Sequence, residues 1–149
     1  MQGREMRYES MIKQCVSLIE GETDIIANLS NVSALLNDFL EDVNWVGFYL
    51  LKNGELVLGP FQGPVACVRI KVGSGVCGAA VSENKIQVVK DVHKFPGHIA
   101  CDLSTNSEIV VPIIKEGKIF GVLDIDSESV GRFDDVDAKY LGKLVEYLV

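Results

Sequence analysis

The stretch VNWVGFYLLKNGELVL, residues 43–58, decides the fold class of this chain. It predicts one strand over Val43–Leu51 and a second over Glu55–Leu58, because the Asn53-Gly54 pair between them supplies the positive φ angles of a tight hairpin turn. Both alternating faces of the first strand are apolar, which indicates that the sheet is covered on both sides. One face carries Val43, Trp45, Tyr49 and Leu51, and the other carries Val46, Phe48 and Leu50.

Helices flank this hairpin in the sequence. Apolar residues recur at three- and four-residue spacing through the first 40 residues, with a break at Gly21 and an N-cap at Thr23 or Asp24, which predicts two opening helices. Asp134 is expected to cap a closing helix. Strands between terminal helices indicate an α+β fold, and the lack of a repeat or linker predicts one domain over residues 1–149.

The middle of the chain completes the predicted sheet and covers it. Further strands are expected at Ala66–Val72, Ile86–Val89, Ile109–Ile114 and Lys118–Ile125, with a turn at Glu116-Gly117 joining the last two. The segment Asp91–Asn106 has no period and reads as a long loop. Because the helices can cover one face of the sheet and such loops the other, we expect a pocket between the sheet and the loops.

The composition narrows the classes of partner. Of 149 residues, 48% are hydrophobic, and 21 Asp and Glu outnumber 14 Lys and Arg to give a net charge of −7. Without any basic run, the chain lacks the attraction to phosphate backbones or anionic lipid, so nucleic acids and membrane surfaces are poor partners. The start of the chain lacks the apolar region of a secretory signal, so we expect a cytoplasmic protein. In that reducing compartment the four cysteines are not expected to form structural disulfides.

Two acids on one predicted strand are candidates for proton transfer. Asp124 and Asp126 are two residues apart, so their side chains point to one side of the strand. The same face is expected to carry Phe120 and Val122, which makes it an otherwise apolar surface. Burial and mutual repulsion raise the pKa of at least one of these acids, which suits a general acid near neutrality. The alternative is that the strand ends at Ile125 and both acids cap the following turn.

Glu108 is a third candidate, and its placement depends on strand register. If the Lys115–Lys118 connection is an even-numbered loop, Glu108 lies on the opposite sheet face from the two aspartates. An odd-numbered loop or a bulge places it beside them. The sequence alone leaves both arrangements open.

The four cysteines differ in their expected surroundings. Cys101 lies in the aperiodic loop over the predicted pocket, which favours it as a reactive nucleophile. Cys67 on a strand and Cys77 in a Gly-rich bend are both candidates to resolve an oxidised Cys101. The alternative for any of these thiols is simple packing as a small apolar group, and Cys15 on the first helix is assigned to that role.

Two patterns resemble cofactor motifs but match them poorly. His93, His98 and Cys101 lie within nine residues, yet their spacing matches no common zinc site. Gly73–Gly78 satisfies G-x-G-x-x-G, but the helix that should follow is broken at residues 82–84, which argues against a dinucleotide. We expect these glycines to turn the backbone and to present N–H groups, which can hold a small anion such as a carboxylate.

Trp45 and Tyr49 lie four residues apart on one face of the first strand. Core packing is one interpretation of this pair. If that face is the pocket side, the two rings instead form a wall suited to an apolar or sulfur-bearing group, because methyl and thioether contacts with rings are favourable. Their spacing does not choose between the two.

A series of motifs resembles those of a known enzyme family. They are NWVGFY (44–49), LGPFQG (58–63), Ala66-Cys67, GVCG (75–78), DVH (91–93), FPGHIACD (95–102), SEIVVP (107–112) and GVLDIDS (121–127). From about Asp24 to the C-terminus the chain closely resembles the free methionine-(R)-sulfoxide reductases, which are stand-alone GAF-domain enzymes. The block that ends at Cys101 is more specific than a general GAF pattern.

The resemblance implies a fold and an order among the cysteines. The fold is a GAF-like α+β domain, in which a central antiparallel sheet has helices on one face and a loop-covered ligand pocket on the other. Cys101 is implied to be the nucleophile, Cys67 the resolving thiol and Cys77 an auxiliary thiol.

The resemblance also implies a pocket chemistry. Glu108, Asp124 and Asp126 match the family's pocket carboxylates, with Glu108 or Asp126 as the proton donor. Trp45 and Tyr49 match the residues around the substrate methyl group. No cofactor and no metal are implied.

The implied activity is the reduction of free methionine-(R)-sulfoxide to methionine. The Cys101 thiolate attacks the sulfoxide sulfur and becomes a sulfenic acid, which condenses with Cys67 to a disulfide that thioredoxin reduces. A homodimer is left open. The competing interpretation, from a different class, is a GAF-type binding module that senses a small ligand or an oxidant.

Overall fold

The computed structural model describes residues 2–98, 101 and 103–149 of the chain. Its helices are α1 (Gln2–Ile19), α2 (Ile25–Phe39), α3 (Gly75–Glu83) and α4 (Asp135–Val145), with a 3₁₀ turn η1 (Val92–Lys94). Its strands are β1 (Trp45–Lys52), β2 (Glu55–Gln62), β3 (Arg69–Lys71), β4 (Gln87–Val89), β5 (Ser107–Lys115) and β6 (Lys118–Ser127). The predicted α+β class is confirmed.

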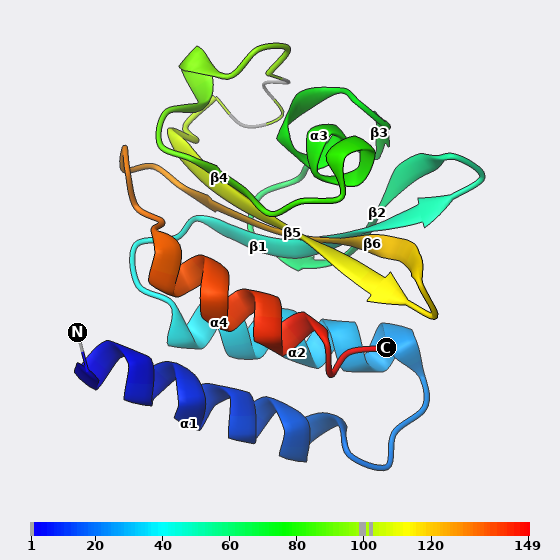
Figure 1. Cartoon of the computed structure of the whole chain (residues 1–149), viewed down its shortest axis with the longest axis vertical. Helices are drawn as coiled ribbons and strands as arrows, with labels where there is room; N and C mark the ends of the chain where they lie inside the picture. The colour runs from blue at the N-terminus through cyan, green and yellow to red at the C-terminus, as the bar shows by residue number, and fades with distance from the viewer. Residues whose placement is uncertain (1, 99–100, 102) are drawn as a thin grey trace.

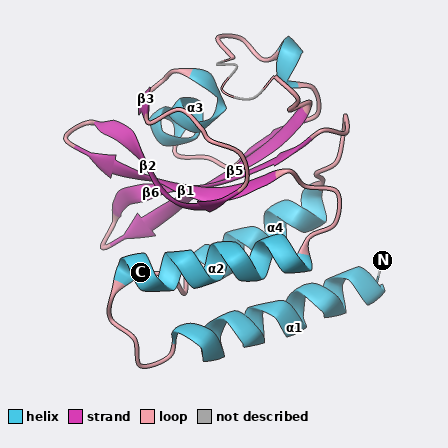
Figure 2. Cartoon of the chain, turned by 180° about the vertical axis from the view of Figure 1, so that it is seen from behind, coloured by secondary structure: helices cyan, strands magenta, loops and turns pink. Residues whose placement is uncertain are grey.

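The six strands form one antiparallel sheet in the order β3-β2-β1-β6-β5-β4. Helices α2 and α4 pack on one face of the sheet, and α1 lies across both as an outer layer (Figures 1 and 2). Helix α3 and the 3₁₀ turn η1 lie on the other face (Figure 1). No helix among the described residues is long and apolar enough to span a bilayer.

The local signals in the sequence are confirmed. Asn53 and Gly54 have φ angles of 51° and 82°, and Glu116 and Gly117 have φ angles of 51° and 78°, as tight hairpin turns require. Asp24 caps α2 by accepting a hydrogen bond from the Ala27 N–H at 3.0 Å. The third strand is shorter than the predicted 66–72, because the residues before Arg69 pair with β2 only at the Leu58 N–H.

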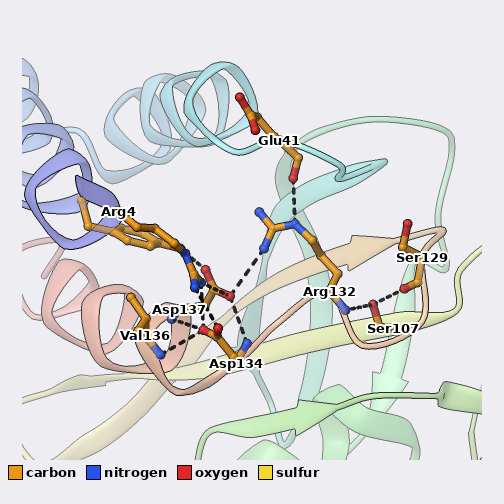
Figure 3. Close-up of polar contacts among 9 residues, drawn as sticks. Arg4, Glu41, Ser107, Ser129, Arg132, Asp134, Val136 and Asp137 are labelled. Atoms are coloured by element: carbon orange, nitrogen blue, oxygen red, sulfur yellow. Dashed lines mark hydrogen bonds and ion pairs between the residues drawn. The ribbon is translucent and has the colours of Figure 1, made fainter. Parts of the chain in front are cut away.

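Asp134 caps α4 and also binds Arg4 of α1 (Figure 3). It is part of a capping box with Asp137, and both of its carboxylate oxygens accept hydrogen bonds from the Arg4 guanidinium, at 2.7 and 2.8 Å. Arg132 donates to the Glu41 carbonyl at 2.8 Å and pairs with Asp137 at 3.4 Å. This network fixes α1 and the turn before β1 to the start of α4.

The sheet separates two apolar cores. The helix-side core contains Val46, Phe48 and Leu50 of β1, and the core on the α3 side contains Trp45 and Tyr49 of the same strand. The predicted division of β1 between two covered faces is therefore confirmed. Val43 is the exception: it was expected beside Trp45 but packs against the helix-side core. The strand begins only at Trp45, so the alternation does not extend back to Val43.

A β-bulge in β6 changes which side chains share a face. Ile113 pairs with Gly121 and Ile114 pairs with Ile119, so Phe120 is the extra residue. Phe120 packs against the helix-side core, whereas Val122 lies in the other core. The expectation that Phe120 shares a face with Asp124 and Asp126 is wrong, because the bulge reverses the alternation at that point.

Candidate active site

A pocket opens between the sheet and the elements on its α3 side. It encloses about 550 Å³, part of which is continuous with solvent. Strands β1, β5 and β6 form its floor, α3 forms one wall, and the exposed Val65 and the half-buried Cys101 lie at its mouth. Of the sequence-predicted site residues, those that line it are Trp45, Tyr49, Cys77, Cys101, Glu108, Asp124 and Asp126. Cys67 lies at the mouth, joined to Cys101.

Three carboxyl groups meet in the floor of this pocket. Glu108 pairs directly with Asp126 across the β5–β6 ladder, and Asp124 is two residues along the same face. The connection at Glu116-Gly117 has an even number of residues, but the bulge at Phe120 shifts the register by one and turns Glu108 toward the aspartates. Because β6 continues to Ser127, the alternative in which the strand ends at Ile125 is wrong.

Burial shifts the pKa values of Glu108 and Asp124. The exposed fractions of Glu108 and Asp124 are 8% and 5%. Burial raises the pKa of Glu108 well above its ordinary value, and the negative charges of Asp124 and Asp126 raise it further. Burial also raises the pKa of Asp124, although hydrogen bonds with its neighbours oppose the shift. No lysine or arginine is present among the described lining residues, so a proton on Glu108 relieves the repulsion.

The cysteines occupy three different environments. Cys67 and Cys101 form a disulfide at the pocket mouth, with 5.5 Å between their Cα atoms. Cys77 is buried in the first turn of α3, and its Sγ lies 4.0 Å from Glu108 Oε2. Burial, followed by the charges of the neighbouring acids, raises the pKa of the Cys77 thiol well above its ordinary value. Cys15 is buried in the helix-side core, as expected, and burial raises its pKa to about 11.

Two aromatic rings form an apolar wall of the pocket. The Trp45 and Tyr49 ring centroids are 6.0 Å apart. Trp45 Nε1 donates to the Pro64 carbonyl at 3.0 Å, and the Tyr49 hydroxyl donates to the Cys67 carbonyl at 2.8 Å. Their polar atoms are thus committed to the protein, and both rings belong to the core and to the pocket wall.

The first turn of α3 borders the opposite side of the pocket. Ser74, Gly75 and Val76 line it, and Ser74 is the N-cap but makes no side-chain capping bond. Gly73 and Gly75 have φ angles of 88° and 64°, which are strained for other residues. The expectation that these glycines turn the backbone is confirmed, and the free N–H groups of a helix start suit an anion.

The two histidines near Cys101, whose spacing matches no common zinc site, lie in different surroundings. His93 Nδ1 lies 2.9 Å from Asp91 Oδ1, outside the pocket, whereas His98 lines it. Partial burial, and then the charge of His93, lower the pKa of His98, which favours its neutral form. Ile99, Ala100 and Asp102 of the FPGHIACD motif lie outside the described residues.

Among the described residues, a different trio has the spacing for a shared metal ion. The ligand atoms of Cys77, Glu108 and Asp124 lie within 4.8 Å of one another. Hydrogen bonds of Asp124 with Glu108 and Cys77 account for this proximity, so the geometry does not require a metal.

Sequence reasoning missed several pocket residues. Thr105 falls in the segment without a period, and nothing in its pattern marks it as a lining residue. Gly47 and Gly63 shape the aromatic wall, since a Cβ at either position would lie 2.7 or 2.6 Å from the Trp45 ring. Gly47 belongs to the NWVGFY motif, which is the signal that could have identified it.

Comparisons with known proteins agree with this architecture. The family model described as GAF domain matches residues 28–149. The free methionine-R-sulfoxide reductase of Escherichia coli is 55% identical over 141 residues, covering 95% of this chain and 86% of that protein. A Staphylococcus aureus structure described as fRMsr in its reduced form is 60% identical, covers 95% of this chain and 92% of its own, and has a TM-score of 0.93. The Neisseria meningitidis free methionine-R-sulfoxide reductase in complex with its substrate is 47% identical, covers 97% and 87% of the two chains, and has a TM-score of 0.94.

Proposed function

The chain belongs to the GAF-domain family and within it to the free methionine-(R)-sulfoxide reductases, and from that premise we propose that it reduces free methionine-(R)-sulfoxide to methionine. The observation that carries the proposal is the pairing of Cys67 with Cys101 at the mouth of a pocket that holds a buried carboxyl group, Glu108, whose pKa is raised by burial and by the neighbouring acids. A thiol that attacks and a carboxyl that donates a proton are the two groups that sulfoxide reduction requires.

Cys101 is the nucleophile in this scheme. With the disulfide reduced, its thiolate attacks the sulfoxide sulfur, and the S–O bond of the substrate breaks as the oxygen is transferred to Cys101. The substrate sulfur gains two electrons and leaves as the thioether of methionine, while the Cys101 sulfur loses two electrons and becomes a sulfenic acid.

Glu108 or Asp126 supplies the proton that this oxygen needs. The raised pKa of Glu108 favours its protonated form, and its cross-strand partner Asp126 can share that proton. Proton donation as the S–O bond weakens is general acid catalysis. Both carboxyl groups line the same pocket as Cys101.

The remaining walls suit the other parts of a free amino acid. The Asp124 carboxylate complements the substrate ammonium, and the N–H groups at the start of α3 complement its carboxylate. Trp45 and Tyr49 surround the S-methyl group, because thioether and methyl contacts with rings are favourable. A pocket that recognises both the ammonium and the carboxylate excludes methionine sulfoxide within a protein chain.

Reduction by thioredoxin returns the enzyme to its starting thiol form. Cys67 condenses with the Cys101 sulfenic acid, releasing water and forming the disulfide, which a dithiol such as thioredoxin reduces by exchange. Cys77 serves as an auxiliary thiol. Its raised pKa and its burial make it a slow substitute for Cys67.

The test is turnover with resolved R and S isomers of free methionine sulfoxide, followed as NADPH oxidation through thioredoxin and its reductase. We expect turnover of the free R isomer alone and none with the Cys101→Ser variant. If neither isomer yields methionine, even with dithiothreitol and intact thiols, the chain is instead a GAF-type binding module for a small ligand or an oxidant.

A further inference from the structure

Thr105 carries a buried hydroxyl group that the fold does not use. Its side chain lines the pocket and is 5% exposed. The Oγ1 atom is shielded from solvent, and no polar atom of the described residues pairs with it. A buried hydroxyl without a partner destabilises a protein, so its presence in a pocket wall calls for a partner that arrives with a ligand.

The backbone around Thr105 is held firmly. The Asn106 N–H donates to the Ser127 carbonyl at 2.8 Å, and the Asn106 carbonyl accepts from the Val92 N–H at 2.9 Å. The nearby Ser107 hydroxyl, in contrast, donates to the Ser129 carbonyl at 2.5 Å. One hydroxyl of this segment therefore serves the fold, and the other lies on an anchored backbone with its hydrogen-bonding capacity unused.

The aromatic residues and the acids of the pocket do not supply this donor. The polar atoms of Trp45 and Tyr49 donate to backbone carbonyls. Ionised carboxylates only accept hydrogen bonds, so the acids of the floor cannot hold an acceptor unless they are protonated. Thr105 is thus a neutral donor in the pocket lining with no hydrogen-bond partner among the described residues.

We propose that the Thr105 hydroxyl donates a hydrogen bond to the sulfoxide oxygen of the substrate, an inference that rests on the proposed function. That oxygen is a pure acceptor and must lie near Cys101, which attacks the sulfur beside it, and near Glu108, which protonates it. Thr105 is four residues from Cys101 and three from Glu108 in the chain, and all three side chains line one pocket.

The hydrogen bond from Thr105 to the sulfoxide oxygen strengthens as the reaction proceeds. Negative charge develops on the oxygen while the thiolate attacks, and a donor already fixed in place stabilises that charge. With Glu108 on one side, a second donor from Thr105 also fixes the direction of the S–O bond. Thr105 therefore favours the R over the S configuration at sulfur.

Thr105→Val tests this role, because valine keeps the shape and removes only the hydroxyl. We expect kcat/KM for the R isomer to fall roughly tenfold and the preference for R over S to shrink, while Thr105→Ser retains most of both. Binding is measured in the reduced Cys101→Ser background. There, Thr105→Val weakens the affinity for methionine sulfoxide but leaves the affinity for methionine, which lacks the oxygen, unchanged.

Thermal unfolding provides the structural control. Thr105→Val leaves the melting temperature of the reduced protein unchanged or raises it, because the lost hydroxyl has no partner among the described residues of the free protein. Ser107→Ala removes a paired hydroxyl from the same segment, so it lowers the melting temperature without changing the R-to-S preference.

Three outcomes overturn the inference. Equal loss of affinity for methionine and its sulfoxide would place Thr105 against another part of the amino acid. Unchanged kinetics in Thr105→Val would remove the hydroxyl from the reaction while the proposed function stands. Absence of turnover and of sulfoxide binding in the wild-type protein would overturn the proposed function, and the inference with it.

Discussion

Buried acids on the two faces of the sheet have opposite kinds of partner. On the helix side, Asp137 is 1% exposed and accepts hydrogen bonds from the Tyr8 hydroxyl at 2.5 Å and from the Asp134 N–H at 3.0 Å, with Arg4 at 2.9 Å. On the pocket side, the buried Glu108 faces other carboxyl groups. The first arrangement neutralises a charge and holds the helices together, whereas the second keeps a proton available for chemistry.

The cysteines give the largest contrast between the faces. We expect Cys101→Ser to abolish turnover, because the side chain that attacks the sulfoxide is lost. Cys15→Ala on the helix side should instead lower the free energy of unfolding by about 1 kcal/mol and leave kcat/KM unchanged. Coupled turnover assays and urea unfolding of both variants measure these effects. Residual thioredoxin-driven turnover in Cys101→Ser would assign the attack to a different thiol.

Cys67→Ser separates the chemical step from recycling. Each enzyme molecule is expected to release roughly one methionine, because Cys101 can still reduce one substrate but no Cys67 thiol is left to form the disulfide that thioredoxin attacks. Quantifying methionine per enzyme after mixing with excess substrate gives the answer. Undiminished multiple turnover would show that Cys77 resolves the sulfenic acid efficiently despite its raised pKa.

Matched amide substitutions compare the acids directly. Asp126→Asn should lower kcat/KM by about 100-fold, since it disturbs both substrate binding and the shared proton, while changing stability little. Asp137→Asn should lower the free energy of unfolding by about 3 kcal/mol, because it leaves Arg4 and Arg132 without their buried partner. Steady-state kinetics and denaturant unfolding are measured on both variants. Wild-type activity in Asp126→Asn would remove that residue from the site.

The pH dependence of unfolding should have opposite signs on the two faces. Glu108 has a raised pKa, so the folded state binds its proton more tightly, and this contribution to stability is lost as pH rises from the ordinary glutamate range through the folded-state pKa. Asp134 has a pKa lowered by Arg4, so its smaller, partly exposed contribution is present above the ordinary aspartate range and is lost on acidification.

Unfolding midpoints of Glu108→Gln and Asp134→Asn across pH test both signs. Relative to wild type, Glu108→Gln should gain stability as pH rises above the ordinary glutamate range. Asp134→Asn should be less stable than wild type at neutral pH, and this difference in stability should shrink as pH falls. Parallel pH profiles for Glu108→Gln and wild type would contradict the raised pKa.

The parts of the fold that could be predicted are those with a local cause. The hairpin turn at Asn53-Gly54 and the cap at Asp24 depend on a few adjacent residues. The face on which Glu108 lies depends on the bulge at Phe120, twelve residues away in the chain, and no local pattern reveals it. Thr105 lay beyond prediction for a similar reason, because its place in the pocket comes from backbone pairing of Asn106 with β6.

The Cys67–Cys101 disulfide closes a loop across a sequence separation of 34 residues. A cross-link of that span restricts the unfolded chain and stabilises the folded state by roughly 3–4 kcal/mol. In the proposed cycle, the enzyme that has just repaired a substrate molecule is therefore in its more heat-resistant and protease-resistant disulfide form, and reduction by a dithiol returns it to the less stable form. A melting curve recorded without substrate then reports what fraction of the protein holds the Cys67–Cys101 disulfide and has yet to be reduced.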